Sequence, residues 1–179
     1  SIYRDYPNWI PPLRFEVENV FNPKKNSFFD GGVCERYLMY EGEKLVARFA
    51  LMNHPEKDAA LTPKLGGMGF LEMINDQSVA DEVINFARAW HKEYDYSAFR
   101  GPINFGQNMN YWGLLVENFE EPPIYGMFYH PPYYKELLEN TGADKLDDHW
   151  SYKRDFAEPI PERMVRITDR IESRPDVTT

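Results

Sequence analysis

Two carboxylates bracket the end of an apolar run in this chain of 179 residues. Glu72 lies inside the run Met68–Ile74, and Asp76 follows two residues after its end. Carboxylates in this position can deprotonate an ammonium group or simply bind one. A structural role explains the same residues: a strand carboxylate that faces solvent, and an acidic residue near a helix N-terminus, where negative charge is favourable.

Amide side chains form a second candidate binding feature. One loop-like stretch contains four of them, Asn104, Gln107, Asn108 and Asn110. Amides both donate and accept hydrogen bonds, which suits the recognition of a small polar ligand. Turn formation explains such residues equally well, so both interpretations stay open.

The remaining reactive side chains give weaker indications. Tyr133 and Tyr134 follow two prolines, and either donate a proton or pack as aromatic residues. The histidines are scattered without metal-ligand spacing, so we expect no metal site, and we expect His91 at the surface of a helix. Cys34, the only cysteine, is interpreted as a small buried apolar residue in a strand.

A strand–helix–strand unit is expected to position the two carboxylates. The run Met68–Ile74 is typical of a buried strand. Ser78 and Asp81 predict a capping box at the start of a helix, whose apolar face would comprise Val79, Val83, Phe86, Ala87 and Trp90. A second strand over residues 96–103 would run parallel to the first. Parallel strands end at the same edge of a sheet, so we expect residues 72–76 and 102–104 to form one ligand site.

Further elements follow from local patterns. A helix is expected over residues 12–21, and strands over 33–40 and 44–52 form an antiparallel hairpin. Strands over 124–129 and 146–156 would flank a helix that follows Pro131-Pro132 and ends near Gly142. Met164, Ile167 and Ile171 predict an amphipathic helix. We expect one domain over residues 1–157, and a linker helix over 158–179 that leads toward a second, absent domain.

The charge balance limits the classes of partner that the protein is expected to bind. Lys and Arg number 20 against 29 Asp and Glu, which gives a formal net charge of −9. Such a surface repels nucleic acids and anionic membranes, so we expect a small-molecule partner, an amine or another ligand, with no nucleic acid and no membrane. The single cysteine, the absence of a long apolar run and the lack of a signal-peptide pattern predict a cytoplasmic protein. The oligomeric state is left open.

The order of expected elements resembles the acyl-CoA N-acyltransferase (GNAT) superfamily, an α/β (α+β) fold with a central mixed sheet flanked by helices, here without its first strand. The chain looks more specifically like a group of GNAT-like bacterial proteins in which a second, related domain commonly follows. The stretches that carry this resemblance are YPNWIPPL (6–13), NPKKN (22–26), RGPIN (100–104), GLLVENFEEPP (113–123) and HPPYY (130–134).

The resemblance implies binding of acyl-CoA or acetyl-CoA where the strand Met68–Ile74 diverges from its neighbour, with acyl transfer to an amine. It implies cofactor contacts at Met73, Ile74, Asn75 and Asn104. Glu72 would act as the base for the amine, and Tyr134 as the acid for the leaving thiolate.

The sequence departs from the superfamily pattern at the phosphate loop. The usual loop, Q/R-x-x-G-x-G/A, presents bare N–H groups to a pyrophosphate. Residues 73–79 contain no glycine, and they place Asp76 where the anion would approach. Leu138 stands at the usual position of the tyrosine acid, one turn after Tyr134. The alternative is therefore a non-catalytic ligand-binding or interaction domain that has lost the phosphate loop; the acidic surface disfavours an aminoacyl-transferring relative.

Overall fold

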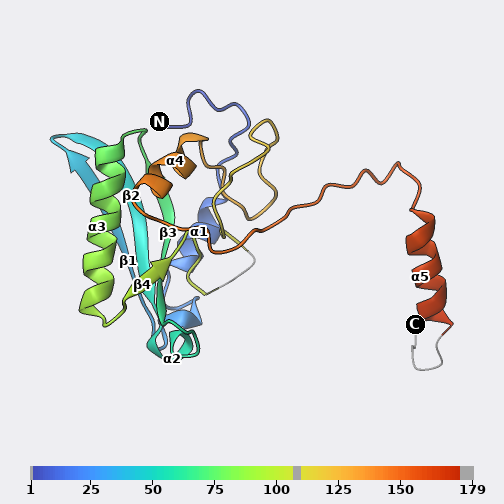
Figure 1. Cartoon of the computed structure of the whole chain (residues 1–179), viewed down its shortest axis with the longest axis horizontal. Helices are drawn as coiled ribbons and strands as arrows, with labels where there is room; N and C mark the ends of the chain where they lie inside the picture. The colour runs from blue at the N-terminus through green and yellow to red at the C-terminus, as the bar shows by residue number, and fades with distance from the viewer. Residues whose placement is uncertain (1, 107–109, 174–179) are drawn as a thin grey trace. The chain divides into compact units, whose positions relative to one another are not determined.

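A four-stranded mixed sheet forms the centre of the computed structural model, which describes residues 2–106 and 110–173 (Figure 1). The strands are β1 (Val33–Glu41), β2 (Lys44–Asn53), β3 (Leu65–Met73) and β4 (Ala98–Arg100), and they lie in that order across the sheet. The first three pair antiparallel, whereas β4 pairs parallel to β3. The expected α/β class, the β1–β2 hairpin and the parallel β3–β4 pair are confirmed.

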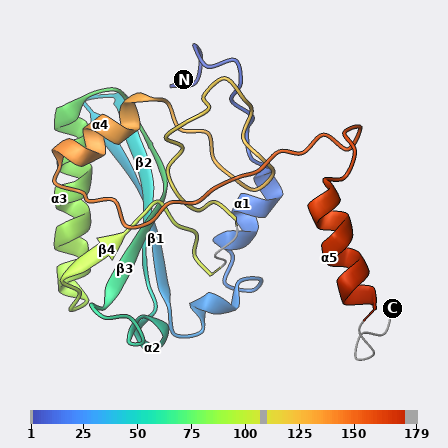
Figure 2. The same cartoon turned by 45° about the vertical axis from the view of Figure 1, so that its right-hand side comes forward.

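Helices cover both faces of this sheet (Figure 2). On one face lie α3 (Gln77–Glu93) and α4 (Tyr133–Asn140); on the other lie α1 (Arg14–Val20) and a single 3-10 turn, Ser27–Phe29. A short helix, α2 (Pro55–Asp58), follows β2. The α3 face holds the larger apolar core, and the α1 face holds a smaller one around Ala50, Met52, Ile103 and Phe105.

The chain divides into two compact units, Ser1–His149 and Trp150–Thr179. The second unit contains α5 (Glu162–Glu172), and the predicted stripe Met164, Ile167 and Ile171 lies on that helix with all three side chains about half exposed. None of the described helices is long and apolar enough to cross a lipid bilayer.

The start of α3 differs from the predicted capping box. The N-cap is Asp76, whose carboxylate accepts hydrogen bonds from the Ser78 backbone N–H (2.8 Å) and the Ser78 hydroxyl (2.7 Å). Asp81 instead accepts from the Gln77 side chain at 2.9 Å. A carboxylate satisfies the orphan N–H groups of a first turn as well as a serine does, so the helix begins two residues earlier than predicted.

The apolar face of α3 is confirmed: Val79, Val83, Ala87 and Trp90 are buried. Phe86 lies at the border of this face, 43% exposed, with its ring against Tyr37 and Phe49. One prediction on this helix is wrong: His91, expected at the surface, is only 1% exposed. It stacks on the Phe99 ring, in space that the missing Cβ of Gly66 leaves open: a Cβ there would lie 2.1 Å from the His91 ring.

Two predicted strands do not form. Residues 124–129 are turns and coil, in which Gly126 carries a positive φ of 79°. Residues 146–156 are also coil, and Trp150, Tyr152 and Phe156 are 70%, 89% and 94% exposed. Alternating aromatic residues fit a strand only where a neighbouring strand can pair with them, and the described residues supply none there.

Glycines in β3 let another segment of chain cross the sheet at close range. Pairing with β4 stops at Gly67, and the Ile103 N–H then donates to the Met68 carbonyl at 2.8 Å. A Cβ at Gly69 would lie 1.8 Å from the Ile103 carbonyl oxygen. Just beyond, Phe70 (φ 52°) forms a bulge, because Ala50 faces Gly69 while Arg48 faces Glu72. The bulge and the crossing chain separate the end of β3 from its parallel neighbour.

Gly69→Ala is expected to lower the free energy of unfolding by about 3 kcal/mol, since its Cβ would overlap backbone atoms that cannot move alone. The melting temperature should fall by roughly 6–12 °C. Gly42→Asn is the control: Gly42 lies in the hairpin turn at φ 58° with no atom within 4 Å, and asparagine tolerates that conformation. Equal melting temperatures for the two variants would contradict the close approach.

Candidate functional site

A hollow on the first unit lies at the carboxyl end of β3. It has a volume of about 730 Å³ and is called the β3-end groove here. Its lining residues come from the N-terminal segment, β2, the end of β3 and α4: Ile2, Tyr3, Asp5, Tyr6, Lys44, Leu45, Val46, Ala47, Arg48, Glu72, Met73, Ile74, Asn75 and Tyr133. The groove therefore brings together four of the predicted site residues, namely Glu72, Met73, Ile74 and Asn75.

Glu72 is already paired in this groove. Arg48 donates to both of its carboxylate oxygens, at 2.6 and 2.7 Å, and the Tyr3 hydroxyl donates to one of them at 3.3 Å. The Arg48 side chain is 55% exposed and that of Glu72 is 25% exposed, so the pair borders solvent. Burial raises the pKa of Tyr3, and the neighbouring Glu72 carboxylate raises this pKa further. A positively charged ligand group would have to share Glu72 with Arg48.

Two adjacent tyrosines of α4 hold the last peptide of β3. The Met73 N–H donates to the Tyr134 hydroxyl at 2.8 Å, and the Tyr133 hydroxyl donates to the Met73 carbonyl, also at 2.8 Å. Tyr134 is fully buried, and burial raises its pKa, so the hydroxyl keeps its proton. Burial also raises the pKa of Tyr133 to about 12. The Tyr134 oxygen thus occupies the hydrogen bond that a ligand carbonyl would take at Met73.

Asp76, at the head of α3, occupies the position expected for a phosphate. The Ser78 hydroxyl and backbone N–H lower the pKa of its carboxyl group, so Asp76 is ionised at neutral pH. The Ser78 N–H in the first turn of α3 is therefore satisfied by a side chain of the protein itself. A pyrophosphate at this helix terminus would meet a negative charge.

The described residues of the amide-rich loop do not line the groove. Asn104 is only 4% exposed, its side-chain oxygen accepts from the Phe105 N–H at 2.8 Å, and it lines a different, smaller pocket. Asn110 lies outside the lining of both hollows. Gln107 and Asn108 fall outside the described residues. Because β4 pairs only with the start of β3, the residues that follow it lie beside Met68 and Gly69, not beside Glu72.

Sequence reasoning missed two residues that define the groove, Arg48 and Tyr3. The signal for Arg48 was an arginine inside an otherwise apolar strand, between Ala47 and Phe49. Tyr3 carried no signal, because only folding brings it to a residue 69 positions away. Cys34 is half-buried in the smaller core, and burial raises the pKa of its thiol to about 12, which disfavours the nucleophilic thiolate.

The chain is similar to two curated bacterial proteins. It is 31% identical over 165 residues to a protein named "Bacterial ceramide synthase" from Caulobacter vibrioides, which covers 92% of this chain and 43% of that protein. It is 27% identical over 179 residues to "Protein YghO" from Escherichia coli K12, covering 97% of this chain and 45% of that protein. The chain thus spans less than half the length of these relatives. No protein-family model and no solved structure matches it.

Tyr134→Phe is expected to lower the free energy of unfolding by about 2 kcal/mol, because it leaves the buried Met73 N–H without a partner. Urea unfolding at pH 7 measures the change. Tyr125→Phe is the matched control: Tyr125 is 73% exposed and bonds to Glu16 at the surface, so its loss should change stability by less than about 0.5 kcal/mol. Equal stability of Tyr134→Phe and the unmodified protein would contradict the anchoring of Met73.

His130, which packs against Tyr134, should make the protein acid-sensitive. Burial lowers the pKa of His130 to about 4, against an ordinary value of about 6.5 in an unfolded chain. Above about pH 6.5 both states are neutral at this site. As the pH falls from about 6.5 to 4, the unfolded chain gains a proton that the folded protein excludes, so about 3 kcal/mol of stability is lost.

The difference between two variants isolates this effect from other titrating groups. Between pH 7 and pH 4, His130→Gln should lose about 3 kcal/mol less than the unmodified protein in urea unfolding. His149→Gln, at an exposed histidine, should follow the unmodified protein. Identical pH dependence of all three proteins would contradict the buried, neutral state of His130.

Proposed function

We propose that this protein transfers an acyl group from acyl-CoA to the amino group of a long-chain amine, on a GNAT-like scaffold. The observation that carries the proposal is the similarity to the protein named as a bacterial ceramide synthase, which extends over 92% of the chain. A ceramide is the amide of a fatty acid and a long-chain amino alcohol. Its synthesis is therefore an acyl transfer to an amine, the reaction class that the resemblance to the GNAT superfamily also implies.

The reaction makes limited demands on the protein. The neutral amine attacks the thioester carbonyl, a C–N bond forms, the C–S bond breaks, and the CoA thiolate leaves. A base takes one proton from the amine, and an acid gives one to the thiolate. A backbone N–H that donates to the carbonyl oxygen stabilises the negative charge that develops there.

The β3-end groove, together with the fully buried Tyr134 that bonds to Met73, offers groups for each of these tasks. In this proposal Glu72 receives the amine proton, and the Met73 N–H polarises the thioester carbonyl after the Tyr134 hydroxyl gives up that hydrogen bond. Tyr134, protonated and adjacent, donates to the departing sulfur. The groove volume of about 730 Å³ lies within the range of small-molecule sites, about 300–1,000 Å³. Ile74 and Asn75 then contact the cofactor.

A second candidate function, a non-catalytic ligand-binding domain on the same scaffold, is favoured by two observations. The Tyr134 hydroxyl already occupies the Met73 N–H, and Asp76 already caps the helix where the CoA pyrophosphate would bind. Such a domain would bind the long-chain amine through Glu72 and leave acyl transfer to another part of a longer protein.

Mass-spectrometric detection of amide formation tests the two functions. The full-length protein is given acetyl-CoA or a long-chain acyl-CoA together with sphinganine. We expect amide product, and Glu72→Gln should lower kcat by about 100-fold with little change in KM, because it removes the base. Glu18→Gln is the matched control, since that carboxylate lies on α1, is exposed and pairs only with Arg14 among the described residues.

The outcomes separate the two candidates. Suppose that Glu72→Gln leaves product formation unchanged but weakens sphinganine binding. This result would assign ligand binding alone to this chain. A thermal-shift titration measures that binding, because a ligand of the native state raises the melting temperature. Absence of both product and thermal shift would refute both functions.

A further inference from the structure

A group of exposed apolar side chains borders the β3-end groove. It consists of Leu38 and Tyr40 of β1 and Leu45 of β2, and it is called the hairpin strip here. These side chains are 59%, 55% and 46% exposed. A single exposed leucine is ordinary on a protein surface, whereas a contiguous apolar group beside a polar groove indicates a binding surface.

The strand register places the hairpin strip on the same face of the sheet as Glu72. Leu38 lies opposite Arg48, and Arg48 lies opposite Glu72, so the three residues form one row across β1, β2 and β3. Tyr40 lies opposite Leu45 in the next row towards the hairpin turn. Because opposite residues of paired strands point to the same face, all five side chains share one side of the sheet.

The cover that α1 gives to this face ends one row before the strip. In that row Arg36 lies opposite Ala50, and the Arg36 guanidinium lies 4.9 Å from the ring of Phe21, the residue directly after α1. Ala50 is fully buried, whereas Leu38 in the next row is largely exposed. The other face of the hairpin is covered here, because the Tyr37 ring packs against α3. The described chain therefore leaves only the strip side open at this end of the hairpin.

Leu45 makes the strip continuous with the groove, because it lines the groove together with Arg48 and Glu72. Neighbouring strands lie about 4.8 Å apart, so Leu38 is roughly 10 Å from Glu72 across the sheet. A ligand that reaches from the Glu72 carboxylate to the strip must therefore be extended, with a polar group at one end and an apolar part at the other.

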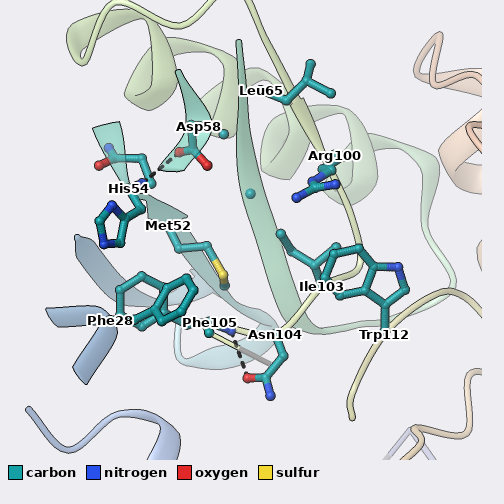
Figure 3. Close-up of a pocket in the computed structure, with 14 residues that line it drawn as sticks. Phe28, Met52, His54, Asp58, Leu65, Arg100, Ile103, Asn104, Phe105 and Trp112 are labelled. Atoms are coloured by element: carbon teal, nitrogen blue, oxygen red, sulfur yellow. Dashed lines mark hydrogen bonds between the residues drawn. The ribbon is translucent and has the colours of Figure 1, made fainter. Parts of the chain in front are cut away.

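The smaller pocket at the start of β3 offers no room for such a ligand. It holds about 50 Å³, and Phe28, Phe105 and Trp112 are among its lining residues (Figure 3). This volume accommodates only a few water molecules. The pocket also shares no lining residue with the β3-end groove. The hydrocarbon chain of an amine at Glu72 would therefore find its apolar contacts on the hairpin strip.

We propose that the hairpin strip binds the hydrocarbon chain of the long-chain amine whose amino group meets Glu72. This inference rests on the proposed function of the groove, and it names the residues that select the amine by chain length. Full burial of one CH₂ group tightens binding about fourfold. A chain on an open sheet face is covered on one side only, so each CH₂ on the strip should tighten binding about twofold.

Isothermal titration calorimetry of the full-length protein with octylamine and dodecylamine, each below its critical micelle concentration, tests the proposal. We expect dodecylamine to bind at least tenfold more tightly than octylamine, because four further CH₂ groups contact the strip. Leu38→Ser and Leu45→Ser should each lower this affinity ratio at least threefold. Leu146→Ser is the matched control: Leu146 is 71% exposed in the coil after α4, and this variant should keep the ratio of the unmodified protein.

Three results would overturn the proposal. The first is equal affinity for the two amines, and the second is an affinity ratio that Leu38→Ser and Leu45→Ser leave unchanged. The third is dissociation of a dimer in Leu38→Ser, measured by light scattering, which would assign the strip to a second copy of the chain. If the variants do not fold, as circular dichroism would report, the comparison of the two amines on the unmodified protein still decides.

The same measurements separate this inference from acyl transfer. Chain-length-dependent binding without amide product would refute acyl transfer and support the strip as the site of the amine chain. Amide product together with equal affinity for the two amines would support acyl transfer and refute the role of the strip. Variants that change the dependence on acyl-CoA chain length instead would assign the strip to the acyl donor and overturn the proposal.

Discussion

The peptide of Met73, held between two tyrosine hydroxyls, is the constraint on which the shape of the larger groove depends. β4 pairs with β3 only through Gly67, so the outer edge of the last residues of β3 needs other hydrogen-bond partners. Tyr133 and Tyr134, on the first turn of α4, supply them at 2.8 Å each. An unpaired peptide group at this depth is costly, so the two bonds fix α4 against the sheet. Tyr133 thereby becomes one wall of the groove.

The early separation of β3 and β4 has a second cause in the glycines of β3. Without side chains at Gly66, Gly67 and Gly69, the ring of His91 and the backbone of Ile103 approach the strand at distances that a Cβ would forbid. The chain after β4 therefore turns across the strand instead of continuing along it. As a result, the two hollows lie at opposite ends of β3, one around Glu72 and the other around Arg100.

The same contacts bear on both candidate functions of the groove. In the proposed acyl transfer the Met73 N–H would bind the thioester, and the Tyr134 hydroxyl now occupies that N–H. A binding domain needs no such exchange, because Glu72 alone can meet an ammonium group beside Arg48. The Asp76 carboxylate at the N-terminus of α3 also distinguishes the two candidate functions, because it disfavours binding of a pyrophosphate but not of an amine.

Local sequence patterns predicted the structure correctly where the contacts are made between residues that are close together in the sequence. The hairpin, the strand Met68–Ile74, the apolar face of α3 and the end of α4 near Gly142 follow from alternation, helical spacing and a glycine at positive φ. The grouping of Glu72 with residues 73–75 also follows, because they are consecutive. The alternation of aromatic residues over 146–156 led to a wrong strand prediction, because a strand needs a partner strand that the local sequence does not specify.

The sequence by itself determined the positions of α1, α3, α4 and α5 and of the strands β1 to β4, but not of the short helix α2, because side-chain period and turn chemistry act over a few residues. Only the tertiary structure decided that Tyr3 and Arg48 meet Glu72, that the Tyr134 hydroxyl holds Met73, and that Asn104 lies apart from them. These contacts join residues 24 to 69 positions apart. They depend on where a crossing chain can approach glycine, which is a property of packing in three dimensions and leaves no periodic trace in the sequence.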